Sequence, residues 1–331
     1  MSALGTTDTR AGWLAPATWR RLFRDQPILP LIALLGLLVV LSQLARPGIV
    51  TPEWVGVILR AAVPLTILAG CQTLAMLTGG IDLSVGAVAS MSGFLVATLV
   101  GDQGLVVAVV VALVAAALAG LVNGIGVGVF RVHPLIMTLG MSLVVLGLAN
   151  VWQITMVQTG AGVPPELRSV GTGLSFTVVP HSLIVFAPLA LAILLGLRRT
   201  GYGRMLYAIG DNPVAARLSG ARAWQVLVVL YVISAVLAAI AGFLLSGLTN
   251  VASVSLADTS VLPSVAAAVI GGTSIMGGRG GYGGTIVGAL ILTVVTSLLT
   301  SLGYPEAVRQ ILFGAIIVLV AAAYTRVTSE S

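Results

Sequence analysis

One carboxylate stands between long apolar stretches of this 331-residue chain, in the sequence TGGIDLSVG at 78–86. Gly79 and Gly80 favour the unwinding of a helix, and the side chain of Asp82 or Ser84 can cap the helix that follows. A carboxylate well inside a bilayer costs about 2.5–3.5 kcal/mol even on lenient scales, so Asp82 must face protein, water or an interface. The segment therefore either caps a helix, or lines or gates a polar path.

Other polar residues in apolar runs could hydrogen-bond a passing solute, although contacts between helices are their more common role. The expected path or gate residues are Gly79, Gly80, Asp82, Ser84, Asn123, Asn150, Gln153, Thr273 and Ser274. The last two belong to a second stretch with doubled glycines, IGGTSIMGGRGGYGG at 270–284. Glycine-interrupted apolar segments in both halves of a membrane chain indicate transport along a central path.

Residues for catalysis or metal binding are not grouped in this sequence. His133 and His181 lie far apart, with no second histidine or carboxylate at ligand spacing, so no metal site is expected. The absence of lysine excludes a Walker A phosphate loop and a lysine Schiff base, and no G-x-S-x-G elbow occurs. We therefore expect a chain that is not an enzyme and has no cofactor of its own.

Composition identifies the solvent of these residues as lipid. Hydrophobic residues make up 58% of the chain and charged residues 8%, where an ordinary soluble domain has roughly 25% charged residues. Apolar runs able to cross roughly 30 Å of hydrocarbon predict an all-α bundle of about ten transmembrane helices, with eight or nine as alternatives. The expected helices cover 28–45, 55–77, 84–100, 105–130, 134–157, 181–197, 224–246, 262–276, 284–302 and 307–324.

The arginines orient this bundle. With ten crossings, twelve of the sixteen arginines fall on the side of the N-terminus, and the other four are Arg46, Arg60, Arg168 and Arg309. Since positive residues favour the cytoplasmic side, both termini are predicted in the cytoplasm. Topology thus explains the net charge of +6, and no nucleic acid partner is expected.

The predicted organisation follows from this topology. A cytoplasmic segment covers 1–27, a single transmembrane domain covers 28–325 with a cytoplasmic loop at 198–223, and a cytoplasmic tail covers 326–331. The longest external loop, near 158–180, is rich in Gly, Pro and Ser and is predicted to be irregular.

Small residues predict one close contact between helices. Gly120, Gly124 and Gly128 recur every four residues and so form a smooth face on one helix. Such a face lets another helix approach closely. The lone cysteine, Cys71, lies in an apolar run and is expected to be a small core residue.

The cytoplasmic loop contains a short capped helix in GDNPVAARLSG, residues 210–220. Asp211 or Asn212 can accept the first free amides, Pro213 suits the first helical position, and Gly220 suits a left-handed stop. A helix is therefore predicted over 213–219. Isolated helices below roughly 12–15 residues are marginal in water, so this helix needs a surface, either its own bundle or a cytoplasmic partner.

The chain resembles the permeases of the ribose-type branch of ABC importers over nearly the whole of 55–324. The shared stretches are TGGIDLSVGA (78–87), GLVNG (120–124), HPLIMTLG (133–140), GYGRMLYAIGDNPVAARLSG (201–220) and AAAVIGGTSIMGGRGGYGGTIVGALI (266–291). The resemblance implies a subunit of the bacterial inner membrane that forms the path for a pentose or hexose. It also implies partners: ATPase subunits that bind ATP and Mg²⁺, a second permease subunit, identical or paralogous, and an external solute-binding protein.

The resemblance assigns a role to the short cytoplasmic helix. In ABC importers an E-A-A-x-x-x-G loop fits into a groove of the ATPase, and here Val214 occupies the glutamate position. The residues expected to couple to the ATPase are Arg204, Asn212, Pro213, Val214, Ala215, Ala216, Arg217 and Gly220. The alternatives are an ABC permease for a nucleoside or polyol, or an ion-coupled secondary transporter of a small polar solute that uses Asp82.

Overall fold

The computed structural model describes residues 28–156 and 162–329, so the segment predicted as cytoplasmic at 1–27 lies outside the described residues. Its helices are α2 (Ile28–Ala45), α3 (Pro52–Leu77), α4 (Val85–Gly128), α5 (Pro134–Met156), α6 (Pro165–Thr172), α7 (Leu183–Arg199), α8 (Gly201–Asp211), α9 (Pro213–Leu218), α10 (Ala223–Thr249), α11 (Val261–Ile270), α12 (Tyr282–Ser301) and α13 (Glu306–Ser329). A 3₁₀ turn (Asp258–Ser260) precedes α11, and strands β1 (Leu174–Ser175) and β2 (Val179–Pro180) pair antiparallel. The predicted all-α polytopic architecture is confirmed.

Both ends of α3 follow from its sequence. The Thr51 hydroxyl accepts a hydrogen bond from the amide of Trp54, and Pro52 supplies the preset first turn. At the other end Gly79 adopts a φ of +78°, and its amide donates to the carbonyl of Met76. The doubled glycine therefore ends α3, as the sequence predicts, and leads the chain into the unwound segment that carries Asp82.

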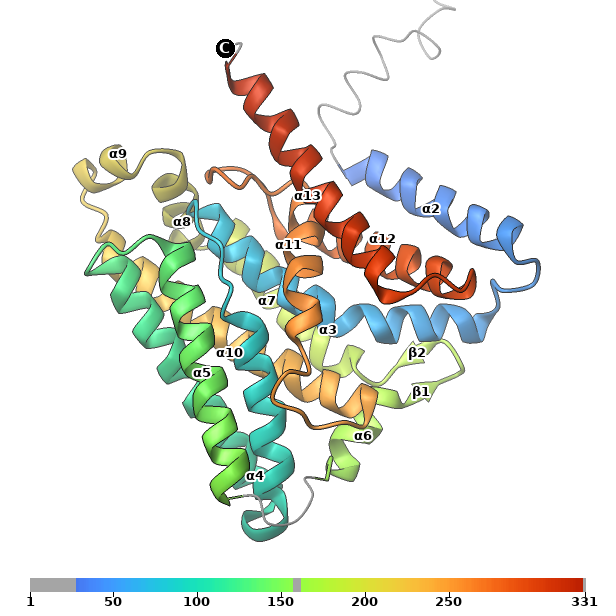
Figure 1. Cartoon of the computed structure of the whole chain (residues 1–331). Coiled ribbons are helices and arrows are strands. Elements are labelled where there is room, and N and C mark those ends of the chain that lie inside the picture. The colour runs from blue at the N-terminus through green and yellow to red at the C-terminus, as the bar shows by residue number, and fades with distance from the viewer. Residues whose placement is uncertain (1–27, 157–161, 330–331) are drawn as a thin grey trace, which may run out of the picture.

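Helix α4 is two antiparallel arms rather than one rod. A straight helix would separate Ser84 from Asn123 by about 58 Å at 1.5 Å per residue. The Asn123 amide instead donates to the Ser84 hydroxyl at 2.9 Å, and Gly104 has φ 77° and ψ 162°. The chain therefore turns back at Gly104, between the helices predicted at 84–100 and 105–130. In Figure 1 the first arm of α4 runs down to the bottom of the molecule, and the second arm runs back up.

Helix α10 lies against both arms of α4 and against α3. A Cβ atom placed on Gly124 would lie 2.5 Å from the Cα of Val228, and one on Gly128 would lie 2.9 Å from the carbonyl oxygen of Trp224. On Gly120 the same atom would overlap the carbonyl oxygen of Tyr231. The predicted small-residue face is confirmed, and α10 is the helix that packs on it.

Within the part of the chain that the structure describes, six helices are long and apolar enough to cross a membrane, or seven if α7 and α8, bent by 68°, count as one span. The predicted eight to ten counts each arm of α4 as a crossing, whereas this number counts the two arms once. Helix α11 has ten residues, or about 15 Å, and is shorter than the crossing predicted over 262–276. The residues after Ile270 form turns, since Gly272, Gly277 and Gly278 all have positive φ.

Two stretches predicted as loops contain regular structure. Residues 165–180, predicted to be irregular, form α6 and the β1–β2 hairpin. Helix α8 precedes the predicted short helix and was not expected, because its glycines weaken the helical pattern. In Figure 1, α9 and the C-terminal end of α13 lie at the upper end of the molecule, whereas α6 lies toward the lower end.

Arginines predicted on the outer side bind the ends of helices. Arg46 Nη1 donates to the carbonyl of Ser301, the last residue of α12, at 3.2 Å. Arg60 Nη1 donates to the carbonyl of Thr172, the last residue of α6, at 2.6 Å. Cations stabilise the negative end of a helix dipole by about 0.3–1 kcal/mol, so these residues have a structural reason to lie there.

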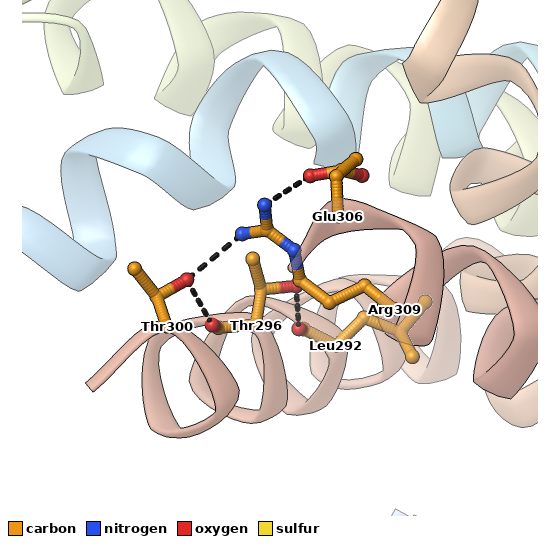
Figure 2. A network of polar contacts seen from close by, with 5 residues as sticks. All are labelled: Leu292, Thr296, Thr300, Glu306 and Arg309. Carbon is orange, nitrogen blue, oxygen red and sulfur yellow. Dashed lines mark hydrogen bonds and ion pairs between the residues drawn. The ribbon is translucent and has the colours of Figure 1, made fainter. Parts of the chain in front are cut away.

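Arg309 closes the turn between α12 and α13 (Figure 2). Its guanidinium forms an ion pair with Glu306, and its Nη1 donates to the Thr300 hydroxyl at 2.8 Å. Thr300 in turn donates to the carbonyl of Thr296, and Thr296 to that of Leu292. This chain of contacts fixes the start of α13 against the last turns of α12.

Candidate functional site

Asp82 lies in the centre of the bundle and not at its surface. Its Oδ1 accepts from the amide of Ser84 at 3.0 Å and from the Ser84 hydroxyl at 2.6 Å. Its Oδ2 accepts from the Ser234 hydroxyl of α10 at 2.8 Å, and 1% of the residue is exposed. Ser84 is the N-cap residue of α4 and makes no side-chain cap bond, so Asp82 joins α10 to the start of α4 rather than capping that helix in the usual way.

The backbone of Asp82 is also held on both sides. The Gln72 side chain of α3 donates to the Asp82 carbonyl at 2.8 Å and accepts from the Asp82 amide at 3.2 Å. The Thr138 hydroxyl of α5 accepts from Leu83 N–H and donates to the carbonyl of Ile81. Four helices, α3, α4, α5 and α10, thus position the segment 78–84.

Two buried polar atoms beside Asp82 have no hydrogen-bond partner. These are Asn123 Oδ1, on the amide that donates to Ser84, and the hydroxyl of Tyr231 on α10. A Cβ atom on Gly80 would lie 3.1 Å from that hydroxyl. Within the described residues the one ion pair is that of Arg309 and Glu306, so the carboxylate of Asp82 has no cationic partner. The site is polar, enclosed and incompletely satisfied.

Cys71, predicted to be a small core residue, packs against the same site. It is fully buried, and its thiol donates to the carbonyl of Ser234 at 3.2 Å. The contact joins α3 to α10 next to the residue that binds Asp82.

The short helix predicted over 213–219 is present as α9, Pro213–Leu218. Asn212 caps it, with Oδ1 accepting from the amides of Val214 and Ala215 at 3.0 Å each, and Pro213 is its first residue. Gly220, with φ +87°, follows its end, as predicted. Ala216 is buried against the bundle, whereas Val214 and Leu218 are 55% and 85% exposed. The bundle therefore anchors one face of α9 and leaves apolar side chains on the other.

A groove of 560 Å³ runs beside α9 toward the ends of α4 and α10. Its walls include Ile209, Trp224 and Leu227, and two exposed arginines, Arg131 and Arg217. Arg204, on α8, is exposed as well. This end of the molecule thus combines exposed apolar residues with basic residues.

The structure brings together some of the predicted path residues and separates others. Asp82, Ser84 and Asn123 form one hydrogen-bonded group. Thr273 and Ser274 are buried in the turn after α11, which touches Gly79 through Met276. Asn150 donates to Leu146 of its own helix, and Gln153 is exposed on α5.

Several residues of the site were not expected from the sequence. Gln72 had a usable signal, since it is a polar amide in the apolar run LAGCQTLAML and such residues usually mark contacts within a bundle. Ser234 had none, because serine is common in the helices of this chain. Tyr231 lies on the face of α10 that meets α4, a contact that only the fold reveals.

Fold and site together define a polytopic helical membrane protein with a polar group enclosed near broken helices. A family model described as "Branched-chain amino acid transport system / permease component" matches residues 55–321. The chain belongs to this family, as a multi-pass protein of the bacterial inner membrane, and the resemblance to ribose-type ABC permeases is confirmed.

Three relatives illustrate the similarity. The ribose import permease protein RbsC of Escherichia coli (strain K12) is 34% identical over 294 residues, covering 87% of this chain and 90% of the relative. RbsC of Bacillus subtilis (strain 168) is 33% identical over 287 residues, with coverage of 86% and 88%. The fructose import permease protein FrcC of Rhizobium meliloti is 31% identical over 300 residues, with coverage of 88% and 83%. No solved structure matches this chain.

Proposed function

We propose that this chain is the permease subunit of an ABC importer for a monosaccharide, a pentose or hexose. Separate ATPase subunits with ATP and Mg²⁺ drive it from the cytoplasm, a second permease subunit completes the path, and an external binding protein delivers the sugar. The support for the substrate class is that relatives at 31–34% identity are named for the import of ribose and fructose. A nucleoside or polyol is the alternative substrate.

The observation that carries the coupling role is the form of α9. A helix of six residues is too short to be stable alone, so it needs surfaces to pack against. The bundle covers Ala216 on one face, and the exposed side chains Val214 and Leu218 remain available to a partner. The family glutamate is replaced by Val214, and Arg217 on the same helix offers a charged contact instead. ATP-driven closure of the ATPase subunits pushes on α9 and tilts the attached helices, opening the path to each side in turn.

The path itself is proposed to pass the unwound segment 78–84. Asp82, Ser84 and Asn123 supply polar groups there, and the unpartnered atoms of Asn123 and Tyr231 leave capacity for a further hydrogen bond. A passing sugar hydroxyl both donates and accepts, so it matches such a site.

Replacing Gly220 with valine is expected to uncouple transport. A Cβ atom at Gly220 meets no other atom within 4 Å, so the effect comes from its φ of +87°, which a β-branched residue rarely adopts. ATP-dependent uptake of radiolabelled sugar is measured in proteoliposomes with the ATPase and the binding protein, and we expect it to fall about tenfold with insertion unchanged.

Gly220→Asn is the matched control, because asparagine tolerates the left-handed region and is expected to retain most of the uptake. Normal uptake by Gly220→Val would count against the coupling role of α9. Competition by unlabelled nucleosides or polyols, stronger than that by monosaccharides, would contradict the proposed substrate class.

A further inference from the structure

Three backbone segments meet at glycines close to the end of α3. They are the end of α3, the end of α8 and the turn between α11 and α12. The amide of Gly278 donates to the carbonyl of Leu77 at 3.0 Å. A Cβ atom on Gly210 of α8 would overlap that same carbonyl and would lie 2.5 Å from the Gly278 nitrogen. We call this set, Leu77, Gly79, Gly210, Gly277 and Gly278, the glycine junction.

Gly277, in the turn between α11 and α12, lies close to both Gly210 and Gly79. A Cβ atom on it would lie 2.8 Å from the carbonyl oxygen of Gly210 and 3.0 Å from the nitrogen of Gly79. Its φ of +93° also favours glycine. Every one of these contacts joins backbone to backbone, so no change of rotamer could make room for a side chain.

The glycine junction lies between α9, which is proposed to contact the ATPase, and the Asp82 segment, which is proposed to line the path. Gly210 precedes Asn212, the N-cap residue of α9, by two positions, and Gly79 precedes Asp82 by three. An extended chain spans about 3.3–3.6 Å per residue, so neither connection can absorb a large displacement. The Gln72 and Thr138 contacts then hold the backbone of 81–83 on the far side of Gly79.

We infer that the glycine junction carries the movement of α9 directly to the Asp82 segment and to the turn at 271–281, with Gly210 and Gly277 as positioning residues. The inference rests on the proposed function, since it takes the ATPase to act on α9. Closely packed backbone transmits a displacement because protein interiors have low compressibility. The two glycine-broken segments, one in each half of the chain, thereby move as one body with α8 and α9.

The first test is Gly210→Ala. We expect sugar uptake per ATP hydrolysed to fall about tenfold, because the methyl group forces α8 away from Leu77 and Gly278. Binding of the ATPase and its rate of hydrolysis are expected to stay near the wild-type values, since α9 itself is intact. The matched control is Gly201→Ala in the same helix, where the nearest atom to the new Cβ is Arg204 Nη2 at 3.7 Å, and its uptake should be unchanged.

The second test needs no disruptive change and applies even if Gly210→Ala does not accumulate. Spin labels are placed on exposed sites at Met205→Cys in α8 and Met276→Cys in the turn, and in a second protein at Met205→Cys and Leu148→Cys in α5. Labelled protein is diluted with unlabelled protein so that only pairs within one copy contribute. Between the nucleotide-free and ATP-bound complexes, the 205–276 distance should stay constant while the 205–148 distance changes.

The outcomes separate the two proposals. A wild-type chain that neither binds nor stimulates the ATPase contradicts the proposed function. If the chain responds normally to the ATPase but Gly210→Ala couples normally, or the 205–276 distance changes, the proposed function stands and the inference about the glycine junction is wrong.

Discussion

Replacing Gly124 with leucine is expected to prevent the chain from accumulating in a folded form. The Cβ atom alone would lie 2.5 Å from the Cα of Val228 and 3.0 Å from its carbonyl oxygen, so the side chain meets backbone that cannot rotate away. Overpacking costs about 1–3 kcal/mol when neighbours can adjust, and more is expected here because α10 must move as a whole. A loss of 1–2 kcal/mol already changes abundance several-fold.

The measurement is the amount of monodisperse protein after detergent extraction and size-exclusion chromatography. Gly147→Leu on α5 is the matched control, since no atom lies within 4 Å of a Cβ at that position, and it should accumulate like the wild type. Similar losses in both variants would show that the membrane insertion of leucine, not the α4–α10 contact, sets the abundance.

Asp82→Ala is expected to destabilise the protein strongly, whereas Asp82→Asn is not. Alanine removes the acceptor of three hydrogen bonds, one from the amide and one from the hydroxyl of Ser84 and one from Ser234. A buried amide left without a partner costs about 1–3 kcal/mol, and the hydroxyls add to this where they find no new acceptor. Asparagine keeps the shape and one carbonyl oxygen, and it needs no cationic partner.

Thermal unfolding of the purified variants in detergent measures this difference, with a clearly lower midpoint for Asp82→Ala alone. An equal loss in Asp82→Asn would mean that the negative charge itself holds α10 to the start of α4.

Uptake by Asp82→Asn also separates the functional alternatives: an ABC permease stays dependent on ATP and indifferent to an imposed proton gradient. Uptake that follows the gradient in the wild type and is lost in Asp82→Asn would support the ion-coupled transporter.

The positions of most helices follow from apolar length and capping, which act within one segment of the chain. Thr51 and Gly79 fix the ends of α3, and Asn212 and Gly220 those of α9, through contacts between near neighbours in the sequence. The hydrophobic pattern does not record where a helix stops short of a full crossing, as α11 does. It also missed α8, whose glycines lower helical propensity. One of them, Gly210, makes the close contact with α3 and with the turn before α12.

The site was predictable only in part. Asp82, Ser84 and Asn123 stand out as polar residues in apolar surroundings, but their partner Ser234 is 152 residues away from Asp82. A pattern along the chain cannot supply such a pairing. The sequence indicated that Asp82 must avoid lipid, and the choice between a helix cap and an enclosed site depended on how α10 packs across both arms of α4.

The burial of Cys71 gives the protein a built-in reporter of its own integrity. It is the single cysteine of the chain, and it has no exposed surface where α3 meets α10. A water-soluble maleimide should therefore leave the native protein unlabelled and react only when those two helices separate. The rate of alkylation during gentle heating would follow the opening of the bundle next to Asp82 without any engineered residue.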